Sequence, residues 1–241
     1  MRKFLALFFG DMKNISRDSM LLISIFAPFI LAFAMRPGLS FAREILIREL
    51  SFDLSHYYKL IMSVLILITP MMMGMLSGFL ILDERDENIL TFYSVTPLSK
   101  SGYLFYRVAM PTVISFLLSF FVFYFIGIVE CRIELLIPVL LLCALESPMM
   151  ALFLGAFASN KVEGLVLTKA FGILFIAPIA GYFIKSNWQY AAAIAPTYWV
   201  SKALLTGAET SGSYWIFIVV GTAVHLLIIG LLVKRFENLY I

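Results

Sequence analysis

The chain has 241 residues, of which 62% are hydrophobic and 14% are charged, and its mean hydropathy is +0.97. Soluble globular domains carry about 25% charged residues, so this composition excludes an ordinary soluble domain and is typical of a polytopic membrane protein. The formal net charge of +3 is modest and fits membrane topology, so no nucleic-acid partner is expected.

Six apolar stretches are candidates for membrane-spanning helices, each of which needs about 20 mostly apolar residues. They cover residues 20–35, 60–82, 108–129, 135–158, 165–184 and 214–233, and the first of them is short. The sequence shows no internal repeat and no soluble domain beside them. It therefore predicts an all-α polytopic membrane protein, with residues 1–241 forming a single transmembrane domain.

The Lys and Arg residues favour an orientation with both termini in the cytoplasm, because basic residues are enriched in cytoplasmic loops. With the N-terminus inside, most of the 18 basic residues fall on the inner side. Aromatic residues that suit a membrane interface gather around the last outer loop, namely Trp188, Tyr190, Tyr198, Trp199, Tyr214 and Trp215. We therefore expect a multi-pass protein with cytoplasmic N- and C-termini.

The first 18 residues place Phe4, Phe8 and Ile15 on one face of a helix and Lys3 and Lys13 on the other. This pattern predicts an amphipathic helix in the inner headgroup layer, although it also fits the start of the first span. Residues 40–59 alternate apolar and charged side chains. They indicate a second surface helix, on the outside.

Five consecutive charged residues follow the second span, and they are Asp83, Glu84, Arg85, Asp86 and Glu87. Each would cost roughly 2.5 to 3.5 kcal/mol at the centre of a bilayer, so this segment lies at a membrane face. Pro97 stops any helix shortly after. Between the charges and Pro97 lie five apolar residues that are not part of a stretch long enough to span a membrane. They are Ile89, Leu90, Phe92, Tyr93 and Val95. The pattern predicts a short helix whose apolar face a soluble partner can bind.

Glu146 is an acid near the middle of the fourth span. An ionisable group at that depth should face the bundle interior or a water-filled cavity, and Pro148 should kink the helix there by removing a backbone donor. Such a site could bind a cationic substrate or carry a proton. Glu146 could equally be protonated and hydrogen-bonded to a neighbouring helix, which is a structural role.

A cluster of methionines in the second span includes Met72. Flexible thioether side chains suit varied hydrophobic ligands, so Met72 joins Glu146 and Pro148 as a candidate for a substrate pathway; ordinary packing is the alternative. Lys161 and Glu163 belong to a short polar turn between the fourth and fifth spans. This turn is either a second contact with the same soluble partner or simply solvated.

Residues 185–213 form the connection before the last span. The apolar run 191–200 within it is too short to cross a membrane and is interrupted by Pro196, which predicts a re-entrant or interfacial hairpin on the outside. Cys131 and Cys143 would lie about 18 Å apart along a helix. They are not expected to be paired, because a disulfide needs Cα atoms within about 7 Å.

Motifs of known catalytic sites are missing from the sequence. It has no GxxxxGK[ST] phosphate loop, no GxSxG nucleophile elbow, no HExxH and no paired Cys or His spacing. The chain itself is therefore not expected to be an enzyme or to bind a cofactor or a metal. An intramembrane hydrolase is disfavoured for the same reason, and the solitary His56 and His225 are interpreted as structural.

The run LDERDENILTFYSVTPLSKSGYLFYRV, residues 82–108, resembles the segment between spans 2 and 3 of type-2 ABC transporter permeases. In that family the segment is a coupling helix that docks on the ATPase subunit. The strings ESP, NKVEG and PTYW are similar to those of fluoroquinolone or multidrug export permeases. Where the family usually has glycine and threonine ahead of this helix, the chain has residues 87–91, ENILT, which leaves the start of the helix open.

The resemblance implies the membrane subunit of a bacterial ATP-driven exporter, in the plasma membrane. ATP and Mg would bind to a separate ABC ATP-binding subunit, and a second copy of the permease or a sister permease would complete the pathway. The substrate would be hydrophobic or amphipathic and drug-like. The residues implied in coupling are Asp83, Glu84, Asp86, Glu87, Leu90, Phe92 and Tyr93.

Two other functions remain open at this point. The same architecture could serve a self-immunity exporter that removes a bacteriocin or lantibiotic. The chain could also be a membrane immunity protein that sequesters a peptide without transport. An exporter needs a partner ATPase with a phosphate loop, whereas a sequestering protein does not.

Overall fold

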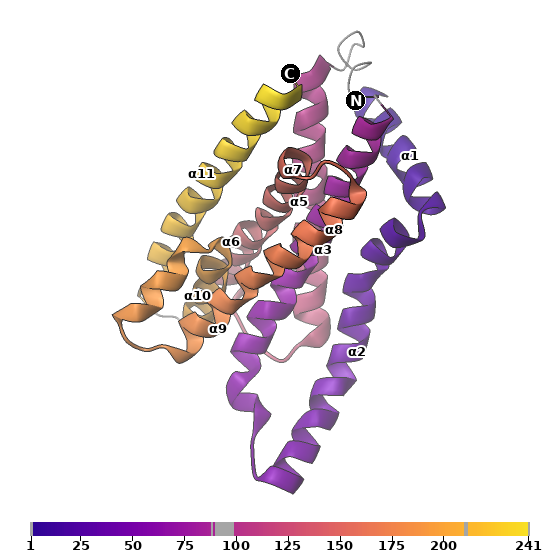
Figure 1. Ribbon diagram of the computed structural model, residues 1–241. Helices are drawn as coiled ribbons and strands as arrows, with labels where there is room; N and C mark the ends of the chain where they lie inside the picture. The colour runs from indigo at the N-terminus through magenta and orange to yellow at the C-terminus, as the bar shows by residue number, and fades with distance from the viewer. Residues whose placement is uncertain (1, 88, 90–98, 210–211, 241) are drawn as a thin grey trace.

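The computed structural model describes residues 2–87, 89, 99–209 and 212–240, and within these ranges the chain is helical with short connections and no strand (Figure 1). The α-helices are, in chain order, α1 (Arg2–Arg17), α2 (Ser19–Leu50), α3 (Tyr58–Asp86), α5 (Ser99–Ile126), α6 (Ile133–Ala144), α7 (Glu146–Phe157), α8 (Lys161–Phe171), α9 (Ile176–Phe183), α10 (Pro196–Ala208) and α11 (Tyr214–Tyr240). Three 3₁₀ segments join some of them, namely η1 (Leu54–Tyr57), η2 (Gly172–Phe175) and η3 (Asn187–Ile194).

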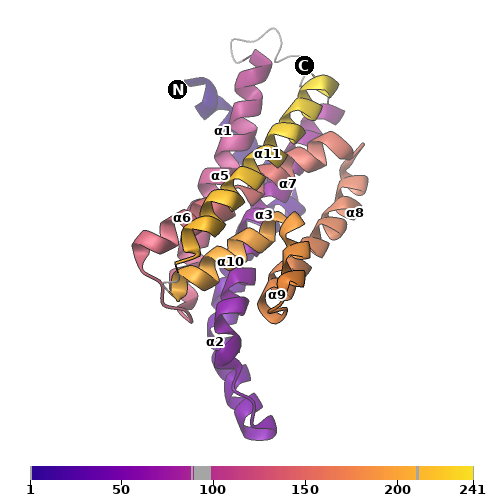
Figure 2. The same ribbon diagram turned by 90° about the vertical axis from the view of Figure 1, so that its left-hand side faces the viewer.

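Six helical segments among the described residues are long and apolar enough to cross a membrane, and they are Ser19–Leu50, Leu54–Asp86, Gly102–Ile126, Ile133–Phe157, Lys161–Phe183 and Tyr214–Leu239. The predicted all-α fold with six spans is confirmed. The second and fourth spans form the centre, since 78% and 72% of their most apolar windows are buried, against 11% for α11. Helices α11 and α2 lie on opposite sides of this centre (Figure 1, Figure 2).

Both termini, the end of α3 and the start of α5 lie at one end of the bundle (Figure 1). We call it the termini end. The hairpin of α2 and α3 extends beyond the other helices at the opposite end (Figure 1, Figure 2). The charged residues after the second span therefore gather at the same end as the amphipathic helix α1.

The first span is much longer than the sequence analysis predicts. Helix α2 continues through Pro28 and Pro37 to Leu50, so the separate surface helix predicted at residues 40–59 is wrong. The helix ends at Ser51, which has a left-handed backbone (φ 51°), and the N–H groups of Ser51 and Phe52 donate to carbonyls in its last turn. Proline costs a helix one hydrogen bond, and the long apolar run before residue 43 outweighs that cost.

Two other local predictions are also corrected. The polar stretch that begins at Lys161 is the start of α8, with Asn160 as its N-cap accepting from the Glu163 N–H and the Glu163 carboxylate accepting from the Ser159 N–H. This reciprocal cap favours a helix over a turn. Pro196 begins α10 instead of interrupting a helix, because proline is well suited to the first helical position.

The kink predicted in the fourth span is confirmed. The helix is interrupted at Leu145, between α6 and α7, and Pro148 cannot donate to the carbonyl of Ala144. Other carbonyls freed by prolines receive donors from neighbouring helices. The Ser77 hydroxyl donates to the Arg107 carbonyl (3.2 Å), and the Thr197 hydroxyl donates to the Leu174 carbonyl (2.6 Å). The Ile66 carbonyl accepts from the hydroxyl of Ser119 (3.4 Å) and from the thiol of Cys143 (3.3 Å).

Helices α3 and α7 pack closely because α3 carries glycine at two positions one turn apart. A Cβ atom at Gly74 would meet the Ser147 carbonyl and would lie 2.7 Å from the Met150 Cβ. A Cβ at Gly78 would lie 2.7 Å from a methyl group of Leu154. The G-x-x-x-G spacing thus lets the two central helices approach at the backbone level.

We expect Gly74→Ala to destabilise the protein by about 1 to 3 kcal/mol, because the new methyl group is forced against the α7 backbone. Gly38→Ala in α2 is the matched control, since nothing lies within 4 Å of a Cβ built there. The measurement is detergent-induced unfolding of the purified variants in mixed micelles. An equal effect of the two substitutions would contradict this account of the packing.

Candidate functional site

Arg107 of α5 is a buried arginine that joins three helices. Its Nη1 and Nη2 donate to Asp11 of α1, both at 2.9 Å, and its Nε and Nη2 donate to Glu84 of α3. The Tyr103 hydroxyl donates to Glu84 (2.6 Å) and the Tyr106 hydroxyl donates to Asp11 (2.8 Å). We call these five residues the Arg107 cluster. It ties α1, α3 and α5 together on both sides of the segment that resembles a coupling helix.

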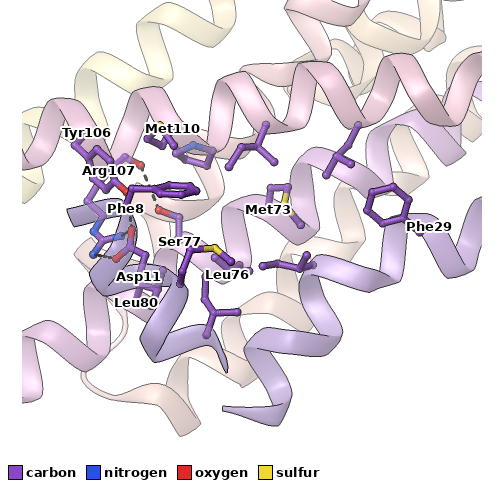
Figure 3. Close-up of a pocket in the computed structure, with 16 residues that line it drawn as sticks. Phe8, Asp11, Phe29, Met73, Leu76, Ser77, Leu80, Tyr106, Arg107 and Met110 are labelled. Carbon is purple, nitrogen blue, oxygen red and sulfur yellow. Dashed lines mark hydrogen bonds and ion pairs between the residues drawn. The ribbon is translucent and has the colours of Figure 1, made fainter. Parts of the chain in front are cut away.

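A cavity of about 400 Å³ lies beside the Arg107 cluster, between α1, α2, α3 and α5 (Figure 3). We call it the α1 cavity. Asp11, Tyr106 and Arg107 lie at one end of it and Phe29 at the other (Figure 3). Its remaining wall is formed by Ser77 and by apolar side chains, which are Phe8, Met12, Ile15, Ile25, Met73, Leu76, Leu80, Met110, Pro111, Ile114 and Leu118. The cavity wall is therefore apolar, and charged residues of the Arg107 cluster lie at one end of it.

Glu146 of α7 and His225 of α11 form a second polar pair, fully buried inside the bundle. His225 Nε2 lies 3.3 Å from Glu146 Oε1, and its Nδ1 lies 2.7 Å from the Gly221 carbonyl. A carbonyl accepts only, so Nδ1 carries a proton. When one further proton lies between Nε2 and Oε1, these atoms form a hydrogen bond and the pair is neutral overall, which lowers the cost of burying it at this depth.

Lys161 connects three further elements near the termini end. Its ammonium lies 2.7 Å from Asp18, the N-cap of α2, and 2.8 Å from Asp83 in the last turns of α3. The hydrogen bond from Lys161 is the main reason that the pKa of Asp18 lies below its ordinary value. Lys161 at the start of α8 therefore links the beginnings of two spans to the end of α3.

The structure describes four of the seven predicted coupling residues. Asp83, Glu84 and Asp86 belong to the last turns of α3 and Glu87 is its C-cap, while Leu90, Phe92 and Tyr93 lie outside the described residues. The Glu84 side chain is buried and bonded to Arg107. Because its carboxylate faces the interior of this chain, we remove Glu84 from the surface expected to meet a partner.

The predicted pathway residues are not gathered into one site. Met72 lines a separate cavity of about 260 Å³ between α3, α7, α8 and η2, together with Met71, Met75 and Met150. Glu146 and Pro148 do not line this cavity or the α1 cavity. Glu146 instead faces His225, which corresponds to the structural alternative of a hydrogen bond to a neighbouring helix.

Sequence reasoning did not single out Asp11 or Arg107, and it treated His225 as solitary and so missed its contact with Glu146. In the sequence Arg107 and Asp11 look like the other charged residues that flank spans. They are 96 residues apart, so no local pattern indicates that they pair. His225 left a weak signal, because it is a histidine inside an apolar span, as Glu146 is an acid inside another. A polar residue in each of two spans indicates that they meet.

Comparison with known proteins finds relatives that match nearly the whole length of the chain. The family described as "Fluoroquinolones export permease protein Rv2686c-like" matches residues 11–233. The chain belongs to this export permease family. Two relatives, from Mycobacterium tuberculosis strains CDC 1551 / Oshkosh and ATCC 25618 / H37Rv, are named fluoroquinolones export permease protein MT2760 and Rv2686c. Each is 32% identical over 231 residues, which is 95% of this chain and 91% of the relative.

Membership confirms the resemblance to type-2 ABC permeases of the drug-export kind. Together with the six apolar spans, it makes the protein a multi-pass membrane protein of an export permease family. No solved structure matches the chain. The geometry of the Arg107 cluster and the α1 cavity is therefore described from this chain alone.

Arg107→Met should lower the free energy of unfolding by about 3 to 5 kcal/mol, because it leaves the Glu84 carboxylate buried without its counter-charge. Glu84→Gln combined with Arg107→Met removes both members of that pair and should recover at least half of the loss. Unfolding in mixed micelles measures both. If the double variant is no more stable than Arg107→Met alone, the two residues are not paired as described.

Glu146→Gln should change stability by less than about 1 kcal/mol, because the Gln amide can donate to the neutral imidazole of His225. His225→Leu should cost about 1 to 3 kcal/mol, since it leaves a buried carboxyl group without a partner. The same unfolding assay compares them. A larger loss for Glu146→Gln than for His225→Leu would contradict the shared-proton arrangement.

Proposed function

We propose that the protein is the transmembrane permease subunit of an ATP-driven exporter that moves an amphipathic, drug-like compound such as a fluoroquinolone out of the cell. The observation that carries this proposal is the family match over residues 11–233, together with two relatives named as fluoroquinolone export permeases. The six spans supply a membrane domain. ATP and Mg would bind on a separate ABC ATP-binding subunit.

Coupling to the ATPase is assigned to the segment between α3 and α5 at the termini end. Asp83, Asp86 and Glu87 lie at its start, and the apolar Leu90, Phe92 and Tyr93 follow in the sequence. In this proposal the aromatic side chains fill a cleft on the ATPase while the carboxylates meet basic groups around it. The termini end would then face the cytoplasm, in the plasma membrane of a bacterium, with both termini inside.

The contacts described above supply a route from that segment into the membrane domain. Movement of the end of α3 would pass to α5 and α1 through Arg107 and to α8 and α2 through Lys161. In this scheme Lys161 acts within the chain. The second contact with the ATPase that the sequence analysis considered for Lys161 and Glu163 is therefore assigned to Glu163 alone. A second copy or a sister permease would complete the pathway.

The test is to co-express the chain with the ABC ATP-binding subunit encoded beside it, purify through a tag on that subunit, and measure ATP hydrolysis in lipid vesicles. Phe92→Ala is expected to weaken association more than tenfold, because truncating a central interface aromatic costs about 2 kcal/mol or more. Glu87→Ala should lower the association rate, most clearly at low salt.

Trp188→Ala is the matched control, since Trp188 is an exposed aromatic (80%) in η3, away from the termini end. It should leave association and hydrolysis within twofold of the wild type. Failure of the two chains to associate would overturn the transporter proposal and favour a sequestering membrane protein. Association that tolerates Phe92→Ala would overturn the assigned coupling segment.

A further inference from the structure

We propose that the α1 cavity is a binding site for an amphipathic cation, whose protonated amine pairs with Asp11 and whose apolar body extends toward Phe29. This inference rests on the proposed export function and specifies where its substrate binds and which chemistry selects it. It differs from the pathway that the sequence analysis assigned to Glu146, which faces His225 inside the bundle.

The size and lining of the α1 cavity fit a single drug-sized molecule. Pockets for such ligands measure about 300 to 1,000 Å³ and are mostly apolar, with a few polar groups that fix orientation. The α1 cavity has about 400 Å³, its wall is apolar, and Asp11, Tyr106 and Arg107 lie at one end of it (Figure 3). Three of its wall residues are methionines from different helices, Met12, Met73 and Met110, whose flexible thioethers adapt to ligands of varied outline.

The charge at the polar end favours a cation. The Arg107 cluster contains two carboxylates, Asp11 and Glu84, and a single guanidinium, so it carries one negative charge in excess when all three are ionised. Among the described residues no other charged side chain forms an ion pair with these two carboxylates. A ligand amine would balance this excess in a poorly solvated place, where the attraction is strong.

Asp11 is the carboxylate that lines the cavity, and it is the one to which we assign the ligand amine. It lines the cavity and its side chain is 13% exposed, whereas Glu84 is 6% exposed and is not part of the wall. Asp11 Oδ2 already accepts from Tyr106 and from Arg107 Nη1, while Oδ1 accepts from Arg107 Nη2. A carboxylate oxygen has two acceptor positions, so Oδ1 retains one for an ammonium group.

The cavity is open to molecules dissolved in the membrane. Its wall includes the exposed Met12 and the half-buried Ile25, Ile114 and Leu118, so it is not sealed inside the bundle. The neighbouring outward residues of α2 and α5 are exposed and apolar, for example Phe26 and Leu117. Amphipathic amines concentrate near the headgroup layer, where an apolar body and a charged group are both accommodated, and α1 is the amphipathic helix on that side of the cavity.

Fluoroquinolones with a piperazine ring have the required chemistry, and they provide a matched pair of probes. Norfloxacin carries a protonated amine at neutral pH, whereas N-acetylnorfloxacin has the same ring system without that charge. Binding of each compound is measured by equilibrium dialysis against the purified permease in lipid nanodiscs, without any ATPase. The wild type is expected to bind norfloxacin about tenfold or more tightly than the acetylated compound, as a charge-assisted contact requires.

Asp11→Asn should abolish this preference while leaving the affinity for N-acetylnorfloxacin within about twofold, because Asn keeps the shape and the oxygen acceptor but removes the charge. Ile114→Phe places a larger side chain from α5 in the apolar part of the cavity and should weaken the binding of both compounds. Asp53→Asn is the control, since Asp53 pairs with Arg43 away from the termini end. Unfolding temperatures of all three variants confirm that each is folded.

The proposal is overturned if the wild type does not distinguish the two probes, or if Asp11→Asn retains the distinction. It is also overturned if native mass spectrometry finds a phospholipid that norfloxacin does not displace and that Ile114→Phe releases, because the cavity is then a lipid site. These outcomes are separate from the coupling test. Asp11-dependent binding without ATPase association would sink the export function alone, whereas norfloxacin export unaffected by Asp11→Asn would sink this site alone.

Discussion

The absence of water in the hydrocarbon core is the constraint on which the whole structure depends. A backbone or side-chain polar group that loses its partner there costs several kcal/mol by order of magnitude, so partners within the protein are strongly favoured. Among the described residues, buried exceptions include the hydroxyls of Ser115 and Ser147. The prolines make this requirement visible. Pro70, Pro111 and Pro178 each free a carbonyl one turn earlier, and hydroxyl or thiol groups from other helices donate to those carbonyls. The same bonds then fix which helices are neighbours.

The charged groups obey the same rule in two different ways. Glu146 and His225 lie 3.3 Å apart in the middle of the fourth and sixth spans, and a single proton between them makes the pair neutral. The Arg107 cluster pairs a guanidinium with two carboxylates and lies instead at the termini end, where the side chains of three helices hydrogen-bond to one another. The neutral pair fastens α7 to α11, while the charged cluster fastens α1 and α5 to the end of α3.

The sequence predicted the features that depend on local pattern. Runs of apolar residues predicted the six spans, and Pro148 predicted the interruption at Leu145. The extent of α2 was not predicted, because the charges between Arg43 and Asp53 suggested a surface helix. The spacing of Gly74 and Gly78 is visible in the sequence and indicates close packing, but spacing does not say which helix is the partner. Local pattern therefore identifies elements, and the identity of neighbours comes from the fold.

Most of the candidate site depends on neighbours. Arg107 meets Glu84 across 23 residues and Asp11 across 96, and nothing in the runs around them distinguishes these three residues from other charges near a membrane face. Glu84 illustrates the consequence, since its place in an acidic run suggested a surface contact and the structure buries it. Residues of one acidic run can therefore differ in role. Asp83 and Glu84 bond within the chain, whereas Asp86 and Glu87 are assigned above to the proposed contact with the ATPase.

The Arg107 cluster also places substrate recognition and helix attachment on the same carboxylate. A ligand amine at Asp11 would share this carboxylate with the two N–H groups of Arg107 that hold α1 against α5. Any ligand that binds one arrangement of these helices better than another shifts the equilibrium between them by that difference in affinity, and no more. Because Arg107 also holds Glu84 at the end of α3, occupancy of the α1 cavity would alter the contacts next to the proposed ATPase-binding segment. Substrate binding and coupling would then be linked through a single guanidinium, without a longer chain of intermediates.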